Sequence, residues 1–228
     1  MNVDKNLVDS IVSKTMDGHT QLPGVSYLMS FEDLYKLLTD EEIAYVKELL
    51  KLDPSEYGVK EPFRGLDDVP SDVVAIENQV VHYDGKDVEV ETMFLPRSVF
   101  EAYTKLRQAY KTESGRSLFV GSGYRSPARQ AVNFFKWLRY YKYDLQKTLG
   151  FVSVPGYSDH GLAKNTAIDF MNQDGIECFD TPPFGNFEET EEYVWLQKNA
   201  EKYDFVLTCT KDNDQGFNFE PWHWQFQG

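Results

Sequence analysis

Cysteine, basic residues and long apolar runs are all scarce in this sequence of 228 residues. Two cysteines, Cys178 and Cys209, are too few for a disulfide framework, and we expect both to be buried thiols. Lys and Arg number 23 against 37 Asp and Glu, and the resulting net charge of -14 argues against nucleic acid as a partner. No stretch approaches the ~20 consecutive apolar residues of a membrane span, so none is expected.

The N-terminal residues MNVDKNLVDSIVSKTMDG lack the basic start and apolar block of a signal peptide. Two interpretations stay open: the protein remains in the cytoplasm, or a leader has been removed and it acts in the cell envelope or as a secreted protein. The sequence predicts no particular oligomeric state. With 41% hydrophobic and 15% aromatic residues, the chain can build one sizeable core with an appended subdomain.

The first part of the chain predicts amphipathic helices over residues 1–55. Ser30, followed by two acidic residues, is typical of a helix N-cap. Residues 52–72 are rich in proline, glycine and aspartate, which indicates a linker or long loop. We therefore predict an N-terminal helical extension at 1–65 and a main domain at 66–228.

The main domain mixes helices with hairpin-linked strands. Asp84-Gly85 between two β-prone runs is a strong hairpin signal. Helices are predicted over 98–112, 127–149 and 189–203, and strands in SLFVGSG, NTAIDF, YDFVLTCT and FNFEPWHWQF. Because no regular βαβ rhythm is present, the pattern favours an α+β fold with a mainly antiparallel central sheet and flanking helices.

His160 and Asp169, in SDHGLAKNTAIDF, are the first candidates for chemistry. Strand alternation puts Asp169 on the opposite face from Ile168 and Phe170. A sheltered carboxylate needs a partner or a cation, and imidazole with carboxylate suits zinc. A pair at this spacing also arises by chance, so the pair alone is weak evidence for a metal site.

The C-terminal segment FEPWHW adds Glu220 and His223. Regular alternation would point residues three apart to opposite faces, but Pro221 disfavours regular pairing, so both could converge on one site. His223 would then be the third metal ligand, and Glu220 would accept a proton from water as general base. The alternative for Glu220 is a surface charge near a strand end.

Arg125 follows the glycine-rich turn GSGY, just ahead of a helix that Ser126 and Pro127 should start. A guanidinium held there could bind a substrate carboxylate or stabilise an oxyanion, whereas a lone Arg in a turn is more often a solvated charge. Tyr124, Trp222 and Trp224 could line a cleft; their alternative role is core packing.

Taken together, SGYRSPARQ, PGYSDHGLAKNTAIDF and FEPWHWQFQG resemble the D-alanyl-D-alanine carboxypeptidase family of zinc metallopeptidases. Its relatives include vancomycin-resistance D,D-peptidases, L,D-carboxypeptidases, phage endolysins and the hedgehog signalling domain. The resemblance covers roughly residues 73–228, with three motifs in the family's order, and leaves residues 1–60 outside.

The resemblance implies roles for individual residues of this chain. His160, Asp169 and His223 match the metal ligands, so Zn²⁺ is the expected cofactor. Glu220 matches the general base, and Arg125 the arginine that grips substrate or stabilises the tetrahedral intermediate. Ser158 and Gln130 match substrate-contacting positions. His19 and His82 match nothing, and we interpret both as structural or exposed.

Two departures from the family pattern are visible. Eight residues separate His160 from Asp169, where the family usually has six, and Asp169 keeps its place only if the extra residues bulge out as a loop. Asp204 stands where the family tends to have glycine; Asp tolerates positive φ better than most residues, so a turn there survives.

The resemblance therefore implies zinc-dependent hydrolysis of a peptide bond next to D-alanine in peptidoglycan stem peptides or their precursors. D,D- and L,D-carboxypeptidase specificity both stay open. The alternatives are a zinc-binding recognition domain without catalysis and a phage-type endopeptidase. The expected partner is a peptidoglycan-derived peptide.

Overall fold

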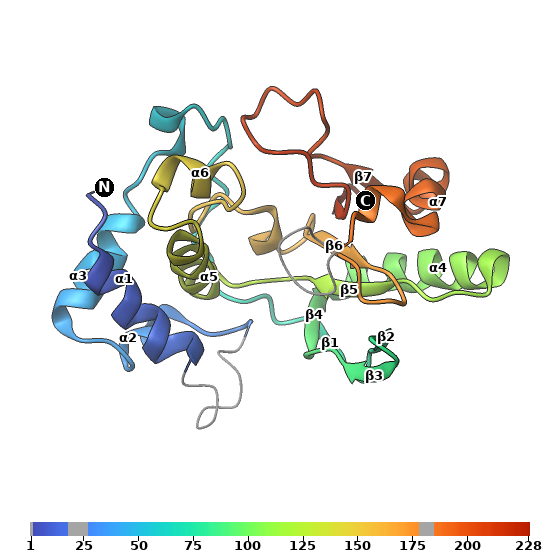
Figure 1. Ribbon diagram of the computed structural model, residues 1–228, viewed down its shortest axis with the longest axis horizontal. Coiled ribbons are helices and arrows are strands. Elements are labelled where there is room, and N and C mark those ends of the chain that lie inside the picture. The colour runs from blue at the N-terminus through green and yellow to red at the C-terminus, as the bar shows by residue number, and fades with distance from the viewer. Residues whose placement is uncertain (1, 18–26, 178–184) are drawn as a thin grey trace. The chain divides into compact units, whose positions relative to one another are not determined.

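The computed structural model describes residues 2–17, 27–177 and 185–228, and the chain forms two compact units (Figure 1). The first, here the helical unit, comprises Met1–Val69, Arg125–Gly161 and Asp212–Asn218. The second, here the sheet unit, comprises Pro70–Tyr124, Leu162–Lys211 and Phe219–Gly228. The predicted domain boundary between residues 65 and 66 stays a prediction.

The helical unit is built from short capped helices. In chain order they are α1 (Lys5–Val12), the π-helix η1 (Ser13–Asp17), α2 (Phe31–Tyr35), α3 (Asp40–Leu49), the 3-10 helix η2 (Pro54–Tyr57), α5 (Pro127–Tyr140), α6 (Leu145–Leu149) and the 3-10 turn η3 (Asp159–Gly161). The predicted N-cap at Ser30 is confirmed, and its side chain accepts a hydrogen bond from the Asp33 backbone. The Ser126 cap and Pro127 at the first helical position are confirmed as well.

The core of this unit lies along α5. Ala131, Val132, Phe134, Phe135 and Leu138 of α5 are fully buried. Tyr45 of α3 stacks on Phe135, with ring centroids 5.6 Å apart. The amphipathic N-terminal helices therefore bury their apolar side chains against α5, as the helical pattern predicted.

The predicted single helix over 127–149 is wrong, because the chain breaks it after Tyr140. Lys142 and Tyr143 adopt positive φ of 57° and 66°, a conformation that no helix can continue through. Asp144 then caps α6. The Tyr143 hydroxyl donates to the carboxylate of Asp9 in α1, and its oxygen lies 2.7 and 2.9 Å from the two carboxylate oxygens. No glycine or proline marks this break.

The sheet unit contains all eight strands of the described residues. They are β1 (Val73–Ile76), β2 (Val80–Tyr83), β3 (Lys86–Glu89), β4 (Met93–Pro96), β5 (Phe119–Ser122), β6 (Ala167–Met171), β7 (Phe205–Leu207) and β8 (His223–Phe226). The helices are α4 (Arg97–Ser114) and α7 (Glu191–Asn199), with 3-10 turns η4 (Phe187–Glu189) and η5 (Ala200–Tyr203). The β2–β3 hairpin at Asp84-Gly85 is confirmed, with φ of 50° and 71° at the two turn residues.

The four-stranded sheet has the order β5-β6-β8-β7, and every pair in it is antiparallel. The predicted α+β fold with a mainly antiparallel sheet is therefore confirmed. Ile168 and Trp224 are opposite one another in the β6–β8 pair, and both are buried. Phe170 on the same face packs on Tyr103 of α4, with ring centroids 6.3 Å apart. This face is the apolar core, which leaves the alternate residues of β6 and β8 for the other face.

Three smaller predictions can be compared with the structure. Asp204 has φ 64°, so the turn expected there is present. Cys209 is buried, while Cys178 lies outside the described residues and its burial stays a prediction. His82 is exposed, as expected, and His19 lies outside the described residues. The described helices include no candidate for a membrane span.

Candidate active site

Asp169 and His223 are brought together by strand register. They are direct cross-strand partners in the β6–β8 pair, so their side chains leave the same face of the sheet. Nδ1 of His223 lies 2.9 Å from Oδ1 of Asp169. Both residues are largely sheltered, with side chains 9% and 17% exposed. Antiparallel pairing thus joins two residues that are 54 positions apart in the chain.

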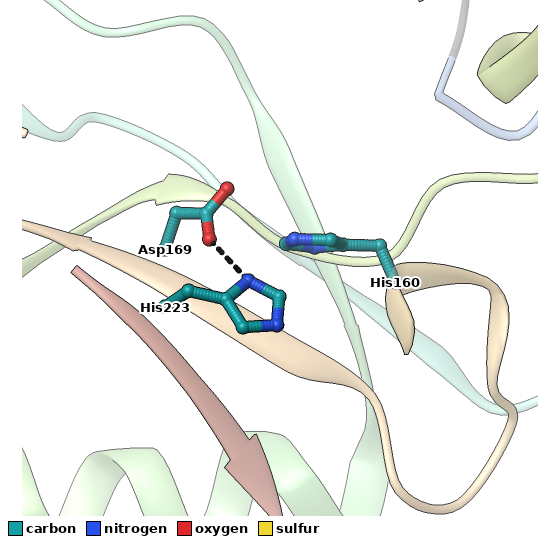
Figure 2. Close-up of side chains that lie close together, drawn as sticks. All are labelled: His160, Asp169 and His223. Atoms are coloured by element: carbon teal, nitrogen blue, oxygen red, sulfur yellow. Dashed lines mark hydrogen bonds and ion pairs between the residues drawn. The ribbon is translucent and has the colours of Figure 1, made fainter. Parts of the chain in front are cut away.

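His160 lies in η3 and is buried. One potential ligand atom from each of His160, Asp169 and His223 can be chosen so that all three lie within 4.8 Å of one another. Figure 2 shows the His160 ring turned toward the Asp169–His223 pair. Two imidazoles and one carboxylate at this separation form a donor set suited to a single zinc ion.

Ser158 shapes the turn that presents His160. Its hydroxyl oxygen accepts a hydrogen bond from the His160 backbone N–H at 3.3 Å, and its carbonyl accepts one from Gly161 N–H at 3.1 Å. Ser158 is itself buried. The structure therefore gives this side chain a local role in the turn, and its contact with substrate stays a prediction.

Arg125 is tied to the same turn through the backbone. Its N–H donates to the carbonyl of His160 at 2.9 Å, which places the SGYRSP and SDHG motifs side by side. The guanidinium Nε donates to Oε1 of Gln130 at 3.0 Å, and Nε2 of Gln130 donates to the Ser153 carbonyl at 2.7 Å. Gln130 is buried and orients Arg125; direct contact of Gln130 with substrate stays a prediction.

Glu220 begins a tight turn that leads into β8. The His223 N–H donates to the Glu220 carbonyl at 3.1 Å, with Pro221 at the second turn position. Strand β8 begins at His223, after this turn, so the predicted distortion at Pro221 is confirmed. The Glu220 N–H donates to the Cys209 carbonyl at 3.0 Å, which fixes the start of the turn. The role of Glu220 as general base stays a prediction.

The aromatic residues predicted to line a cleft are deeply buried. Tyr124, Trp222 and Trp224 are only 1%, 5% and 3% exposed. Trp224 lies on the core face of β8, opposite Ile168, so its role is core packing. The Trp222 carbonyl accepts from Phe170 N–H at 2.9 Å, which extends the β6–β8 pairing by one residue. Substrate contact by Tyr124 and Trp222 stays a prediction.

The two extra residues between His160 and Asp169 are accommodated in a loop. Ala163 and Lys164 are exposed and precede β6. The Thr166 hydroxyl closes the loop by donating to the Leu162 carbonyl, and the Asn165 side chain donates to the Phe226 carbonyl at 3.1 Å. Asp169 keeps its position in β6, so the longer spacing leaves the three-residue cluster intact.

Two features near the cluster were not predicted. Ser122 lies directly opposite Asp169 in the β5–β6 pair, and Asp159, next to His160, forms an ion pair with Arg64. Ser122 pairs with Asp169 because the register shifts between Val120 and Ser122, so regular strand alternation would not have identified it. No sequence signal links Arg64 to Asp159.

Comparisons with known proteins agree on one family. A family model described as "VanY: D-alanyl-D-alanine carboxypeptidase" matches residues 92–228. A protein of Bacillus subtilis (strain 168) with the name "Putative carboxypeptidase YodJ" is 26% identical over 229 residues, which is 99% of this chain and 75% of that protein. The D-alanyl-D-alanine carboxypeptidase of Enterococcus faecium is 22% identical over 85% of this chain and 55% of its own length.

Among solved structures, VanYB in complex with D-alanine-D-alanine is similar over 64% of this chain and 80% of its own. Its sequence identity is 26%, and the TM-score is 0.49. The N-terminal helices and the segment that follows them lie outside the residues that the family model matches.

Proposed function

This chain belongs to the VanY family of D-alanyl-D-alanine carboxypeptidases, and we propose that it is a zinc-dependent carboxypeptidase that removes a C-terminal D-alanine from peptidoglycan stem peptides or their precursors. The observation that supports this most strongly is the cluster of His160, Asp169 and His223, with potential ligand atoms within 4.8 Å of one another. The carboxypeptidase names of the relatives support the reaction class.

The donor set fits zinc. Catalytic zinc sites in hydrolases typically have three protein ligands, often histidine and carboxylate, and they keep a fourth position for water or substrate. His160, Asp169 and His223 supply three such ligands. Zinc bound there supplies Lewis acidity and lowers the pKa of water to about 7.

Glu220 acts as the general base. Its carboxylate accepts a proton from the attacking water and returns it to the amine of the leaving D-alanine, while the new C–O bond replaces the broken C–N bond. The turn Glu220–His223 supports this role, because the backbone hydrogen bond between these two residues holds Glu220 close to one proposed metal ligand.

Arg125 stabilises the negative charge that develops on the scissile carbonyl oxygen. Its Nε is held by Gln130 and its backbone by His160, so the guanidinium reaches the reaction with little loss of conformational freedom. Removal of a comparable oxyanion donor lowers kcat by roughly 100- to 1000-fold in other enzymes.

The presence of both Glu220 and Arg125 favours an enzyme over a zinc-binding recognition domain, which would not need either group. An exopeptidase must also capture the free carboxylate of its substrate. Ser158 and Gln130 match substrate-contacting positions of the family, and we assign this capture to them, which supports removal of a terminal residue over cleavage of an internal bond.

The test is mass spectrometry of defined tri-, tetra- and pentapeptide muropeptides incubated with the zinc-loaded protein. We expect release of one D-alanine from the pentapeptide, the tetrapeptide or both. Glu220→Gln should keep its fold and its zinc while turnover falls at least ~100-fold. Glu101→Gln, an exposed acid on α4, is the matched control and should be fully active. Wild-type protein that cleaves none of the three peptides would refute the proposal.

A further inference from the structure

We propose that the segment Glu61–Leu66, here called the brace, positions the loop Ser153–His160, and that Arg64 is a positioning residue for the metal-binding turn. The inference rests on the proposed function and adds a role for a segment that the family model does not match. Both segments belong to the helical unit.

The loop Ser153–His160 has almost no regular secondary structure to hold its shape. From Ser153 to Ser158 it contains no helix or strand, only turns, and it ends in the three-residue η3 turn. Yet it carries Ser158 and His160, which the proposed chemistry requires in one geometry. Ligand groups on an irregular loop are placed accurately only if other segments restrain that loop.

Arg64 makes two separate contacts with this loop. Its backbone N–H donates to the Gly156 carbonyl at 2.7 Å. Its guanidinium Nη2 forms an ion pair with Oδ1 of Asp159, the residue directly before His160. The two side chains are only 24% and 16% exposed, so solvent screens the pair less than a surface salt bridge. One residue of the brace thus restrains both the middle of the loop and the start of η3.

Glu61 restrains the other end of the loop. Its Oε1 accepts a hydrogen bond from the Ser153 hydroxyl at 2.6 Å. The Ser153 carbonyl accepts from Gln130 Nε2 at 2.7 Å, and Gln130 Oε1 accepts from Arg125 Nε at 3.0 Å. The brace is therefore connected to Arg125 as well as to His160.

Close packing joins the two segments between these ends. The Phe63 and Tyr157 rings meet edge to face with centroids 5.3 Å apart. Gly156 has φ +87°, and a Cβ there would lie 2.6 Å from the Phe63 ring and 3.2 Å from the Gly65 carbonyl oxygen. Only glycine allows both this backbone conformation and this approach. The loop is thus shaped to receive the brace.

The consequence is a loss of preorganisation when the Arg64–Asp159 pair is removed. His160 would then sample positions away from the other two ligands, and zinc would bind more weakly. Residues that orient metal ligands indirectly typically contribute 10- to 100-fold to metal affinity. We expect Arg64→Met to weaken zinc binding by about 10-fold.

Zinc affinity, measured by competition with a chromogenic chelator in the absence of substrate, is the main readout. Lys60→Met is the matched control, because it removes one exposed positive charge just before the brace and should leave zinc affinity unchanged.

Arg64→Lys should recover part of the zinc affinity that Arg64→Met loses. Arg64→Met, Asp159→Asn and the double variant form a double-mutant cycle. If both single substitutions act by removing the same ion pair, the double variant should bind zinc no more weakly than the single variant with the lower zinc affinity. Thermal unfolding of the metal-free proteins shows whether each variant is folded.

The outcomes separate this inference from the proposed function. Wild-type zinc affinity in Arg64→Met overturns the role of the brace and leaves the carboxypeptidase proposal standing. A lower unfolding temperature with unchanged zinc affinity overturns it too, since the pair would then serve stability alone. A wild-type protein that binds no zinc overturns the proposed function at its first step. Weaker zinc binding in Arg64→Met that is partly restored in Arg64→Lys supports the role of the brace, even if the substrate is not the one proposed.

Discussion

At the scale of single residues, the described part of the chain contains two cross-strand pairs of histidine and aspartate. Asp169 and His223 approach to 2.9 Å in the β6–β8 pair, and His82 and Asp87 to 3.1 Å in the β2–β3 hairpin. The first pair is sheltered and has His160 beside it. The second is exposed, with side chains 58% and 79% accessible. The exposed pair therefore serves as a control for the sheltered pair.

We expect Asp169→Asn to weaken zinc binding by well over 10-fold, because it removes the only anionic ligand of the cluster while preserving side-chain shape. Asp87→Asn should leave zinc affinity unchanged. Isothermal titration with zinc, or chelator competition, measures both. Equal affinity in wild-type and Asp169→Asn protein would remove Asp169 from the metal site.

The three candidate metal ligands could be predicted from the sequence. His160, Asp169 and His223 were weak evidence as residue types alone, but they stand in motifs that resemble those of the family, and the structure brings them together. The roles of Glu220 and Arg125 stay predictions. The Arg64–Asp159 pair could not be predicted in this way, because each residue has the character of an ordinary surface charge. Their contact depends on how two irregular segments pack, and no local periodicity encodes that packing.

At the scale of elements, α1, η1 and α3 are joined by one buried carboxylate. Glu42 is 2% exposed, and it accepts hydrogen bonds from Lys14 Nζ at 2.7 Å and from the Ser10 hydroxyl at 2.6 Å. Burial alone would raise the pKa of Glu42, but hydrogen bonds from Lys14, Ser10 and Thr39 outweigh it and lower the pKa to about 2. The charged form of Glu42 therefore stabilises the fold.

We expect this contribution to be fully present above the unfolded pKa of about 4.5 and to be lost as the pH falls from there toward 2. Lys14 is 37% exposed, so solvent reduces the effect to roughly 2 kcal/mol at pH 7. Urea unfolding should show Glu42→Gln less stable than wild type by this amount at pH 7, and by less than about half of it at pH 3.

Glu48→Gln is the control for this experiment, because Glu48 lies in the same helix but pairs with Lys51 on the surface. Its effect on the free energy of unfolding should be much smaller. A difference between wild type and Glu42→Gln that stays constant from pH 7 to pH 3 would contradict the assignment of a lowered pKa.

Element types were predicted better than element ends. The hairpin, the Ser30 cap and the Ser126-Pro127 helix start each have a local chemical signature, and each is present. The break after Tyr140 has none: Lys142 and Tyr143 take positive φ without glycine, and the Tyr143 hydroxyl bonds to Asp9 far away in sequence. The end of that helix is set by a tertiary contact, the Tyr143–Asp9 hydrogen bond, whereas the apolar periodicity of the sequence continues beyond Tyr140.

At the scale of the whole molecule, residues from distant parts of the chain supply the proposed zinc ligands. A ligand that binds only the folded state stabilises it by RT ln(1 + [L]/Kd), which is about 2.7 kcal/mol at 100 times Kd. The unfolded chain cannot hold His160, Asp169 and His223 together, so the full effect should appear.

We expect zinc at 100 times its measured Kd to raise the melting temperature of the metal-free protein by roughly 5–10 °C. Differential scanning calorimetry with and without zinc measures this shift. Asp169→Asn should lose most of the shift at the same zinc concentration, whereas Asp87→Asn should retain it. A shift of the same size in both variants would mean that zinc stabilises the protein at some other place, and the cluster in Figure 2 would no longer explain it.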